Sequence, residues 1–349
     1  MHLTQISQSL RALGALPCHE QRVLRGWAQV RALERSRQQP EHFLPLALRR
    51  ALPALQAQWQ GLAQVLSAHD SADGSRRLLV RLTDGQTVES VLLPHGGLCV
   101  STQVGCAVGC LFCMTGRDGL ARQLGSAEIV AQVVLARQQR AVNKVVFMGM
   151  GEPAHNLDAV LEAIDLLGTL GGVGHKNLVF STVGDARVFE RLPQGLVKPA
   201  LALSLHTTRA DLRARLLPRA PRISPADLVA AADAYARTTG YPAQVQWTLL
   251  RGVNDGDDEI EGITQLLRGR HAMLNLIPYN RVDGLDFERP DVERATVMFR
   301  TLNKRGILTR LRQSAGQDVE GGCGQLRSRT LPLSPAVSGR VVEIVVDKS

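Results

Sequence analysis

Three cysteines, Cys106, Cys110 and Cys113, lie within eight residues of this chain in the spacing Cys-x3-Cys-x2-Cys. Thiolates are the usual protein ligands of iron–sulfur clusters, and a [4Fe–4S] cluster normally takes four of them. Three clustered cysteines can hold three irons and leave the fourth iron open to a substrate or cofactor. That count favours catalytic chemistry over electron storage.

Two other interpretations of the cysteine triplet stay open from spacing alone. A structural zinc site also uses clustered cysteines, but it takes four tetrahedral ligands, usually in two pairs. No second pair of cysteines, and no Cys/His pair, lies near the triplet in the sequence. The remaining interpretation is three buried cysteines with no chemical role.

A glycine-rich segment, Phe147-Met-Gly-Met-Gly-Glu-Pro153, follows a short apolar run. Glycines such as Gly151 let the backbone approach a ligand closely. Glu152 can accept hydrogen bonds from an ammonium group. The same residues also suit a simple turn.

Polar residues stand where three later apolar runs end: Ser181, the segment Ser204-Leu205-His206, and Asn280. Each alone is typical of a cap or a turn. If the runs are parallel strands, their carboxyl ends meet at one edge of the sheet. We therefore expect these groups to form a ring around one pocket.

Two further cysteines stand apart from the triplet. Cys323 lies in Gly321-Gly-Cys-Gly-Gln325, and a cysteine flanked by glycines suits entry into an active site as a nucleophile better than packing. Cys99 lies seven residues before the triplet, and a buried strand cysteine is an equally good interpretation of it. Cys18 has no comparable context and is interpreted as structural.

Short apolar segments that alternate with helical patterns must position these residues. Such alternation predicts a parallel sheet, and six units are too few for a closed eight-stranded barrel. We therefore expect an α/β fold, a partial (β/α)6 barrel over residues 98–326. Predicted helices include 126–138 and 156–168. The predicted strands are 98–104, 144–149, 177–182, 199–204, 244–249 and 272–277.

Smaller parts flank the predicted barrel. Leu, Val and Ala at helical spacing predict a helical module over residues 1–65, and a β-hairpin linker with the turn Asp84-Gly85 is expected over 66–97. Residues 327–349 are interpreted as a tail with one strand at 340–346. The arginines of the first module suit an RNA grip, although each one alone suits a solvated helix surface equally well. They are Arg11, Arg22, Arg25, Arg31, Arg35, Arg37, Arg49 and Arg50.

The composition limits the class of protein. The 349 residues are 44% hydrophobic and carry a net charge of +9, from 41 basic and 32 acidic side chains. An excess of arginine suits phosphate contacts but also occurs in basic enzymes that bind no nucleic acid. No apolar run has the length of a membrane span, and the first residues lack the pattern of a signal peptide. We expect a cytoplasmic protein with reduced cysteines and no membrane contact.

Together these motifs resemble the RlmN/Cfr family of dual-specificity radical S-adenosylmethionine (SAM) RNA methyltransferases. The similarity runs from residue 73 to residue 326, most of the chain. It rests on the cysteine triplet, the glycine-rich segment, the upstream Cys99 and the loop Cys323-Gly-Gln-Leu326. The combination of the triplet, Cys99 and that loop is highly specific.

The resemblance implies a mechanism. Cys106, Cys110 and Cys113 would bind one [4Fe–4S] cluster, whose open iron binds SAM. Cys323 would carry a methyl group to an adenine carbon of RNA, Glu89 would accept a proton, and Cys99 would release the product by forming a disulfide with Cys323. The positions that match SAM contacts are Gly151, Glu152, Ser181, Ser204, Leu205, His206 and Asn280.

The resemblance also implies partners. The expected substrate is ribosomal RNA, with transfer RNA second and C2 favoured over C8, and the expected electron donor is a flavodoxin or a ferredoxin. A monomer is expected. Gly-Glu-Pro is followed here by Ala154-His155, and Ser181-Thr-Val-Gly184 by Asp185-Ala186, where the family usually has other residues. These departures and the weak N-terminal match leave the RNA target least specified. The alternatives are a radical SAM enzyme with a non-RNA substrate and a non-catalytic iron–sulfur RNA-binding or sensor protein.

Overall fold

The structure is a computed structural model that describes residues 1–33 and 43–328. Arg35 and Arg37 of the predicted RNA grip, and the predicted strand at 340–346, lie outside these ranges. Among the described helices, none has both the length and the apolar composition to span a bilayer.

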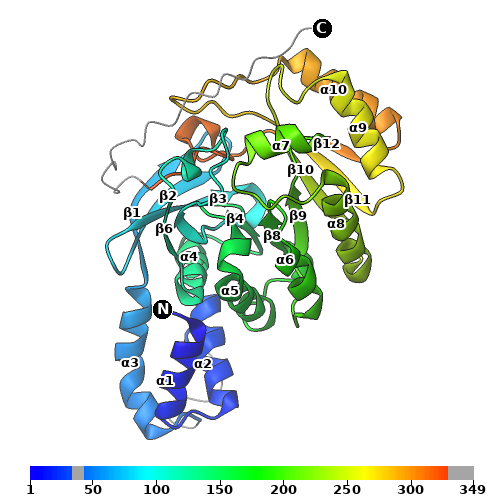
Figure 1. Cartoon of the computed structure of the whole chain (residues 1–349). Helices are drawn as coiled ribbons and strands as arrows, with labels where there is room; N and C mark the ends of the chain where they lie inside the picture. The colour runs from blue at the N-terminus through cyan, green and yellow to red at the C-terminus, as the bar shows by residue number, and fades with distance from the viewer. Residues whose placement is uncertain (34–42, 329–349) are drawn as a thin grey trace.

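Three helices form the N-terminal part of the chain: α1 (Leu3–Ala12), α2 (Pro17–Gln29) and α3 (Leu46–Gln60). They form because apolar residues recur on one helix face, as Leu3, Ile6 and Leu10 do in α1, and these side chains are buried. Figure 1 shows the three helices as a lobe beneath the rest of the molecule. The side chain of Arg137 joins this lobe to the barrel by donating to the carbonyl of Ala28.

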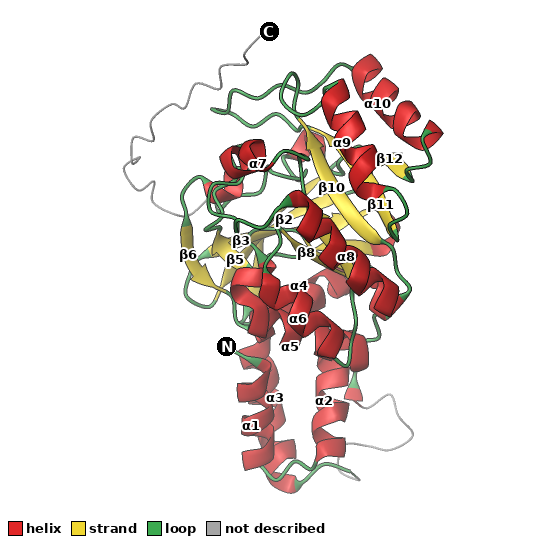
Figure 2. Cartoon of the chain, turned by 45° about the vertical axis from the view of Figure 1, so that its right-hand side comes forward, coloured by secondary structure: helices red, strands yellow, loops and turns green. Residues whose placement is uncertain are grey.

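The barrel helices cover the outer face of the sheet, as Figure 2 shows. The first two agree with the predicted helices 126–138 and 156–168. Helix α8 illustrates why such segments form: Ser224 caps its first turn by accepting from the Asp227 N–H, and Gly240 ends it in the left-handed region. The helices are α4 (Ser126–Gln139), α5 (Leu157–Thr169), α6 (Ala186–Arg191), α7 (Ala210–Leu216), α8 (Pro225–Thr239), α9 (Asp257–Leu267) and α10 (Val292–Lys304).

One ten-stranded sheet carries the rest of the fold, in the order β1-β2-β3-β4-β7-β8-β9-β10-β11-β12. The pairs from β4 to β12 are all parallel, as the strand–helix alternation predicts. The strands of this parallel part are β4 (Gly97–Cys99), β7 (Lys144–Phe147), β8 (Leu178–Thr182), β9 (Ala200–Ser204), β10 (Ala243–Leu249), β11 (Ala272–Pro278) and β12 (Thr309–Leu311).

The first predicted barrel strand, 98–104, is wrong in its extent. Its first half is β4, but the backbone then leaves the sheet, because Thr102 and Gln103 donate to the carbonyl of Met150. Residues Gln103–Gly105 form β5, which pairs with β6 (Leu120–Gln123) in a separate two-stranded sheet.

The segment predicted as a hairpin linker is larger than expected. It contains three antiparallel strands, β1 (Ala63–Asp70), β2 (Arg76–Leu82) and β3 (Thr87–Leu93). Because β3 pairs antiparallel with β4, this meander continues the barrel sheet rather than standing apart from it.

The residues after β12 fold back onto this meander, and we call residues 312–328 the closing segment. The Asp318 carboxylate accepts from the Ala72 N–H (3.1 Å), and the Asp73 carboxylate accepts from the Gly316 N–H (2.9 Å). These contacts place the start and the end of the barrel sheet beside one another.

Candidate active site

The cysteine triplet lies in the loop between β5 and β6, at the carboxyl end of the parallel strands. The loop begins after Gly105, where only glycine fits. Its φ is 77°, and a Cβ there would stand 2.1 Å from the Gly119 carbonyl oxygen. Cys106, Cys110 and Cys113 all line one cavity of about 150 Å³, which we call the small cavity. The structure thus brings the three predicted metal ligands together.

The donor set fits an iron–sulfur cluster. Burial raises the pKa of Cys106 to about 12, and burial together with the neighbouring thiols also raises the pKa of Cys110. A cationic cluster offsets this cost by taking the sulfurs as thiolates. Within the described residues, no three His, Cys, Asp or Glu side chains converge on one ion position.

Gly151 and Glu152 line the small cavity together with the triplet. The Glu152 carboxylate accepts from the Ala154 N–H (3.1 Å) and the Val183 N–H (3.0 Å). Burial raises its pKa to about 7, above the usual carboxyl range, although these hydrogen bonds act in the other direction. A cation placed in the cavity would favour the charged form, so this carboxyl suits an ammonium ligand.

Ser181, Ser204 and His206 line the same cavity, at the ends of β8 and β9. Burial lowers the pKa of His206 to about 3, so the imidazole is neutral. Its Nδ1 accepts from the Thr248 N–H (3.0 Å), which leaves the proton on Nε2. These residues thus form part of the predicted ring around one pocket.

Two predicted cofactor contacts are placed differently. Leu205 is buried in the core and does not line the small cavity, although its N–H donates to the Gln246 carbonyl. Asn280 contacts the closing segment: its amide nitrogen donates to the Cys323 carbonyl (3.0 Å) and to the Ser314 hydroxyl (2.8 Å), and its contact with SAM stays a prediction. Its Oδ1 has no partner within the described residues.

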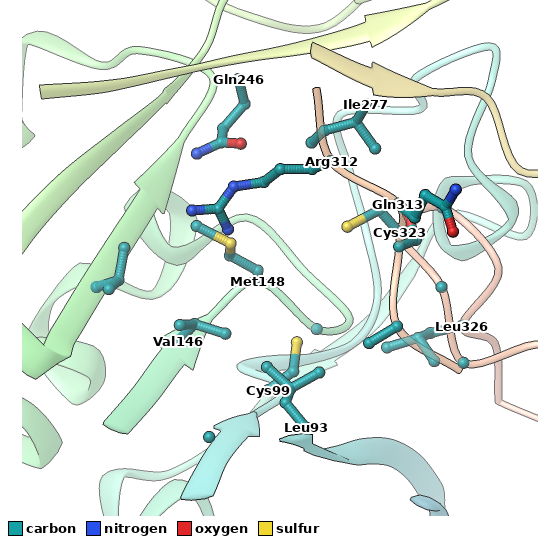
Figure 3. Close-up of a pocket in the computed structure, with 18 of the residues that line it drawn as sticks. Leu93, Cys99, Val146, Met148, Gln246, Ile277, Arg312, Gln313, Cys323 and Leu326 are labelled. Atoms are coloured by element: carbon teal, nitrogen blue, oxygen red, sulfur yellow. The ribbon is translucent and has the colours of Figure 1, made fainter. Parts of the chain in front are cut away.

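Cys99 and Cys323 meet across a second cavity of about 450 Å³, which we call the large cavity. Figure 3 shows both sulfur atoms directed into it, Cys99 from β4 and Cys323 from the closing segment. Both cysteines are free thiols: Cys99 is buried, which raises its pKa, whereas Cys323 is exposed. Cys323 and Cys113 line both cavities, so the two spaces adjoin.

Glu89 lies outside both cavities. It is fully buried on β3, where it forms an ion pair with Arg77 and accepts from the Arg327 N–H (2.9 Å). Arg77 also donates to the Val319 carbonyl, so the pair holds both ends of the loop that carries Cys323.

Sequence reasoning missed several residues at the site. Arg77 lies in an apolar strand and was predicted only as part of that strand. A basic residue in such a run could have indicated a buried acidic partner, here Glu89. Arg213 lies beneath the small cavity, where its guanidinium donates to the Ser204 carbonyl (3.2 Å). Arg312 lines the large cavity directly after a strand too short to be predicted, and no sequence signal marks it.

Comparisons with known proteins agree with this geometry. Residues 100–266 match the radical SAM superfamily. The chain is 70% identical to a protein of Leptothrix cholodnii named a probable RNA methyltransferase, over 99% of this chain and 98% of that protein. A probable RNA methyltransferase of Pseudomonas aeruginosa is 64% identical, over 94% of this chain and 96% of that protein.

A solved structure matches the whole fold. The crystal structure of a radical SAM methyltransferase from Sphaerobacter thermophilus superposes with a TM-score of 0.79 at 34% identity. The match covers 94% of this chain and 98% of that one. The predicted fold class, an α/β partial barrel of the radical SAM type, is therefore confirmed.

Proposed function

This chain belongs to the radical SAM methyltransferases, and on that premise we propose that it methylates an adenine ring carbon of RNA. We propose C2 rather than C8, ribosomal RNA as the first substrate and transfer RNA as the second. The observation that carries the proposal is the large cavity, in which Cys99 and Cys323 face each other beside the cysteine triplet.

A radical route is required by the chemistry of the acceptor. The ring carbons C2 and C8 of adenine lie between nitrogens and are not nucleophilic, so direct displacement at the SAM methyl group fails there. Cys106, Cys110 and Cys113 would hold the cluster, which together with SAM supplies a 5′-deoxyadenosyl radical. Glu152, Ser181, Ser204 and His206 would orient SAM against it, with Gly151 allowing close approach of the backbone.

Cys323 is proposed as the methyl carrier. Its thiolate first takes a methyl group from SAM by displacement, giving a thioether and S-adenosylhomocysteine. Transfer of one hydrogen atom from that methyl group to the 5′-deoxyadenosyl radical would give 5′-deoxyadenosine and a carbon radical, which would add to the adenine carbon. The loop around Cys323 is held from both sides, by Asn280 and by the Arg77–Glu89 pair, which suits a group that must meet two reactants in turn.

Cys99 and Glu89 are proposed to complete the reaction. Glu89 accepts the proton from the adenine carbon, and Cys99 attacks the Cys323 sulfur to form a disulfide and release the methylated base. The released methylene would take up a proton as the carbon–sulfur bond breaks, and the unpaired electron left on the base would return to the cluster. A donor such as flavodoxin or ferredoxin would supply the two electrons that reduce the Cys99–Cys323 disulfide. Glu89 does not line the large cavity in this structure, where its carboxylate accepts from the Arg327 N–H of the closing segment.

The test is anaerobic reconstitution with iron, sulfide, reductant and SAM, incubation with unmodified ribosomal and transfer RNA, and mass spectrometry of the digested nucleosides. The expected product is 2-methyladenosine. If 5′-deoxyadenosine forms without a methylated base, the radical chemistry stands and RNA is the wrong substrate. If neither forms in a preparation with verified iron and sulfide, the enzyme proposal itself is wrong.

A further inference from the structure

The large cavity has a cationic wall that the proposed mechanism does not use. Lys144 opens β7, Arg312 follows β12, and both side chains line the cavity together with His95. No acidic side chain is among the described residues that line it. Apart from Lys144, Arg312 and His95, the ionisable groups among these lining residues are the thiols of Cys99, Cys113 and Cys323.

The backbone of Arg312 is fixed by a hydrogen bond, whereas its guanidinium lines the cavity. Its N–H donates to the Leu276 carbonyl (2.8 Å), which fixes it beside β11. Figure 3 shows the guanidinium directed into the cavity, toward Met148 and Gln246. Arg122 forms an ion pair with Glu128 on the barrel surface, whereas neither Arg312 nor Lys144 has an acidic partner within the described part of the chain.

The cationic groups also act on one another. Desolvation lowers the pKa of Lys144, and the charges of Arg312 and Arg310 lower it further. The pKa of Arg312 is lowered by the same two causes, desolvation and the charge of Arg310. Holding like charges together without a counter-ion is unfavourable, and an anion in the cavity would relieve it.

A buried amide continues this polar wall. Asn275 is fully buried on β11, and neither atom of its amide has a hydrogen-bond partner within the described residues. It lies two positions before Ile277, which lines the cavity, so it is on the same inward face of the strand. In the sheet register it stands between Gln246 and Arg310. Buried amides without partners are rare and point to a ligand or water.

We propose that Arg312 and Lys144 form a phosphate-binding site for the nucleotide whose base enters the large cavity. This inference rests on the proposed function and adds the group that recognises the RNA backbone. An arginine fork matches two phosphate oxygens, and lysine adds a point charge. A base must leave its stack to reach Cys99 and Cys323, so a contact to its own phosphate would fix its depth in the cavity.

The first test needs no methylation. The cluster-loaded protein is titrated with adenosine 5′-monophosphate, adenosine 3′-monophosphate and adenosine. We expect at least one monophosphate to bind about tenfold more tightly than adenosine, as for one lost charge-assisted contact. Arg312→Gln and Lys144→Met should each remove that preference. Arg300→Gln, the same change on the exposed face of α10, should keep it.

The second test uses the RNA that the wild type methylates. Arg312→Gln should lower kcat/KM for that RNA by about tenfold and reduce the salt slope of RNA binding by about 0.7, as for one lost phosphate contact. A single cooperative transition in urea unfolding should be kept in Arg312→Gln, which shows that the variant is folded.

The outcomes separate this inference from the proposed function. No phosphate preference in the wild type, or a preference that survives in Arg312→Gln, overturns the phosphate site. A preference that depends on Arg312, in a protein that methylates no RNA, supports the site with a free nucleotide as its ligand and overturns the RNA proposal.

Discussion

The two adjoining cavities of this protein differ in how completely their side chains are satisfied. In the small cavity, Glu152 and His206 are buried, and backbone N–H groups fix their orientation. In the large cavity, Arg312 and Lys144 face open space without acidic partners in the described chain. A small cofactor can be bound by rigid side chains whose hydrogen bonds are already made within the protein. A macromolecular substrate that must enter and leave needs side chains whose hydrogen-bonding groups are still unpaired.

Cys323 lines both cavities and is the proposed methyl carrier, so its removal should have the largest effect on activity. Cys323→Ala should lower RNA methylation by at least about a thousandfold, because the methyl carrier is gone. Formation of 5′-deoxyadenosine should continue, since the residues proposed to hold the cluster and SAM are unchanged. The exposed Cys18 provides the matched control, and Cys18→Ala should keep full activity. Methylation by Cys323→Ala would contradict the mechanism.

Cys99→Ala separates the two thiols of the large cavity. Without Cys99, the proposed reaction stops before release, so RNA should stay covalently attached to Cys323. A denaturing gel with labelled RNA would show this adduct. Release of methylated RNA by Cys99→Ala at the wild-type rate would rule out its proposed role.

The ion pair behind the large cavity should have the largest effect on stability. Arg77→Met leaves the Glu89 carboxylate buried without its charge partner, and removing one member of such a pair costs about 3–5 kcal/mol. The double variant Arg77→Met/Glu89→Leu should recover most of that loss in urea unfolding. Arg76→Met is the matched control, because its ion pair with Asp70 is exposed and should contribute little. Equal losses in the two single variants would contradict this prediction.

The lowered pKa of His206 should make the free energy of unfolding depend on pH. Its pKa is about 3 in the folded chain and about 6.5 when unfolded, so below pH 6.5 the unfolded state takes up a proton and the native state does not. Its stabilising contribution is complete above pH 6.5 and falls by about 1.4 kcal/mol per pH unit as the pH drops toward 3. Urea unfolding between pH 5 and 7 should show this slope in the wild type and lose it in His206→Gln. Parallel curves would show that the buried imidazole titrates normally.

The smallest expected effect has an unusual sign. Asn275→Leu should stabilise the fold by about 1 kcal/mol, because it removes a buried amide that has no partner in the described structure. The same change at Asn254 should destabilise it, since that amide accepts from the Leu250 N–H and donates to the His206 and Thr248 carbonyls. Thermal unfolding of both variants compares the two directly. Loss of stability in Asn275→Leu would show that Asn275 is paired in solution.

The sequence predicted the small cavity better than the large one. The local spacing of the cysteine triplet is enough to predict it as a ligand set. The polar residues at the strand ends were predicted from the strand–helix alternation. Arg77 and Arg312 could not be assigned, because their roles depend on contacts between segments far apart in the chain. Asn280 was predicted as a cofactor contact, but its observed partners belong to the closing segment, whose path sequence periodicity does not give. The role of each site residue stays a prediction.

The closing segment also sets an order of events during biosynthesis. Asp318 bonds to Ala72 and Arg327 to Glu89 across 246 and 238 residues of chain, so these contacts form only after nearly the whole polypeptide has left the ribosome. Contacts so distant in sequence form late in folding, because they carry the largest loop-closure entropy. The loop with Cys106, Cys110 and Cys113 is synthesised some two hundred residues before Cys323. The nascent chain therefore exposes its three proposed metal ligands to the cellular iron–sulfur supply before the proposed methyl carrier, Cys323, is synthesised.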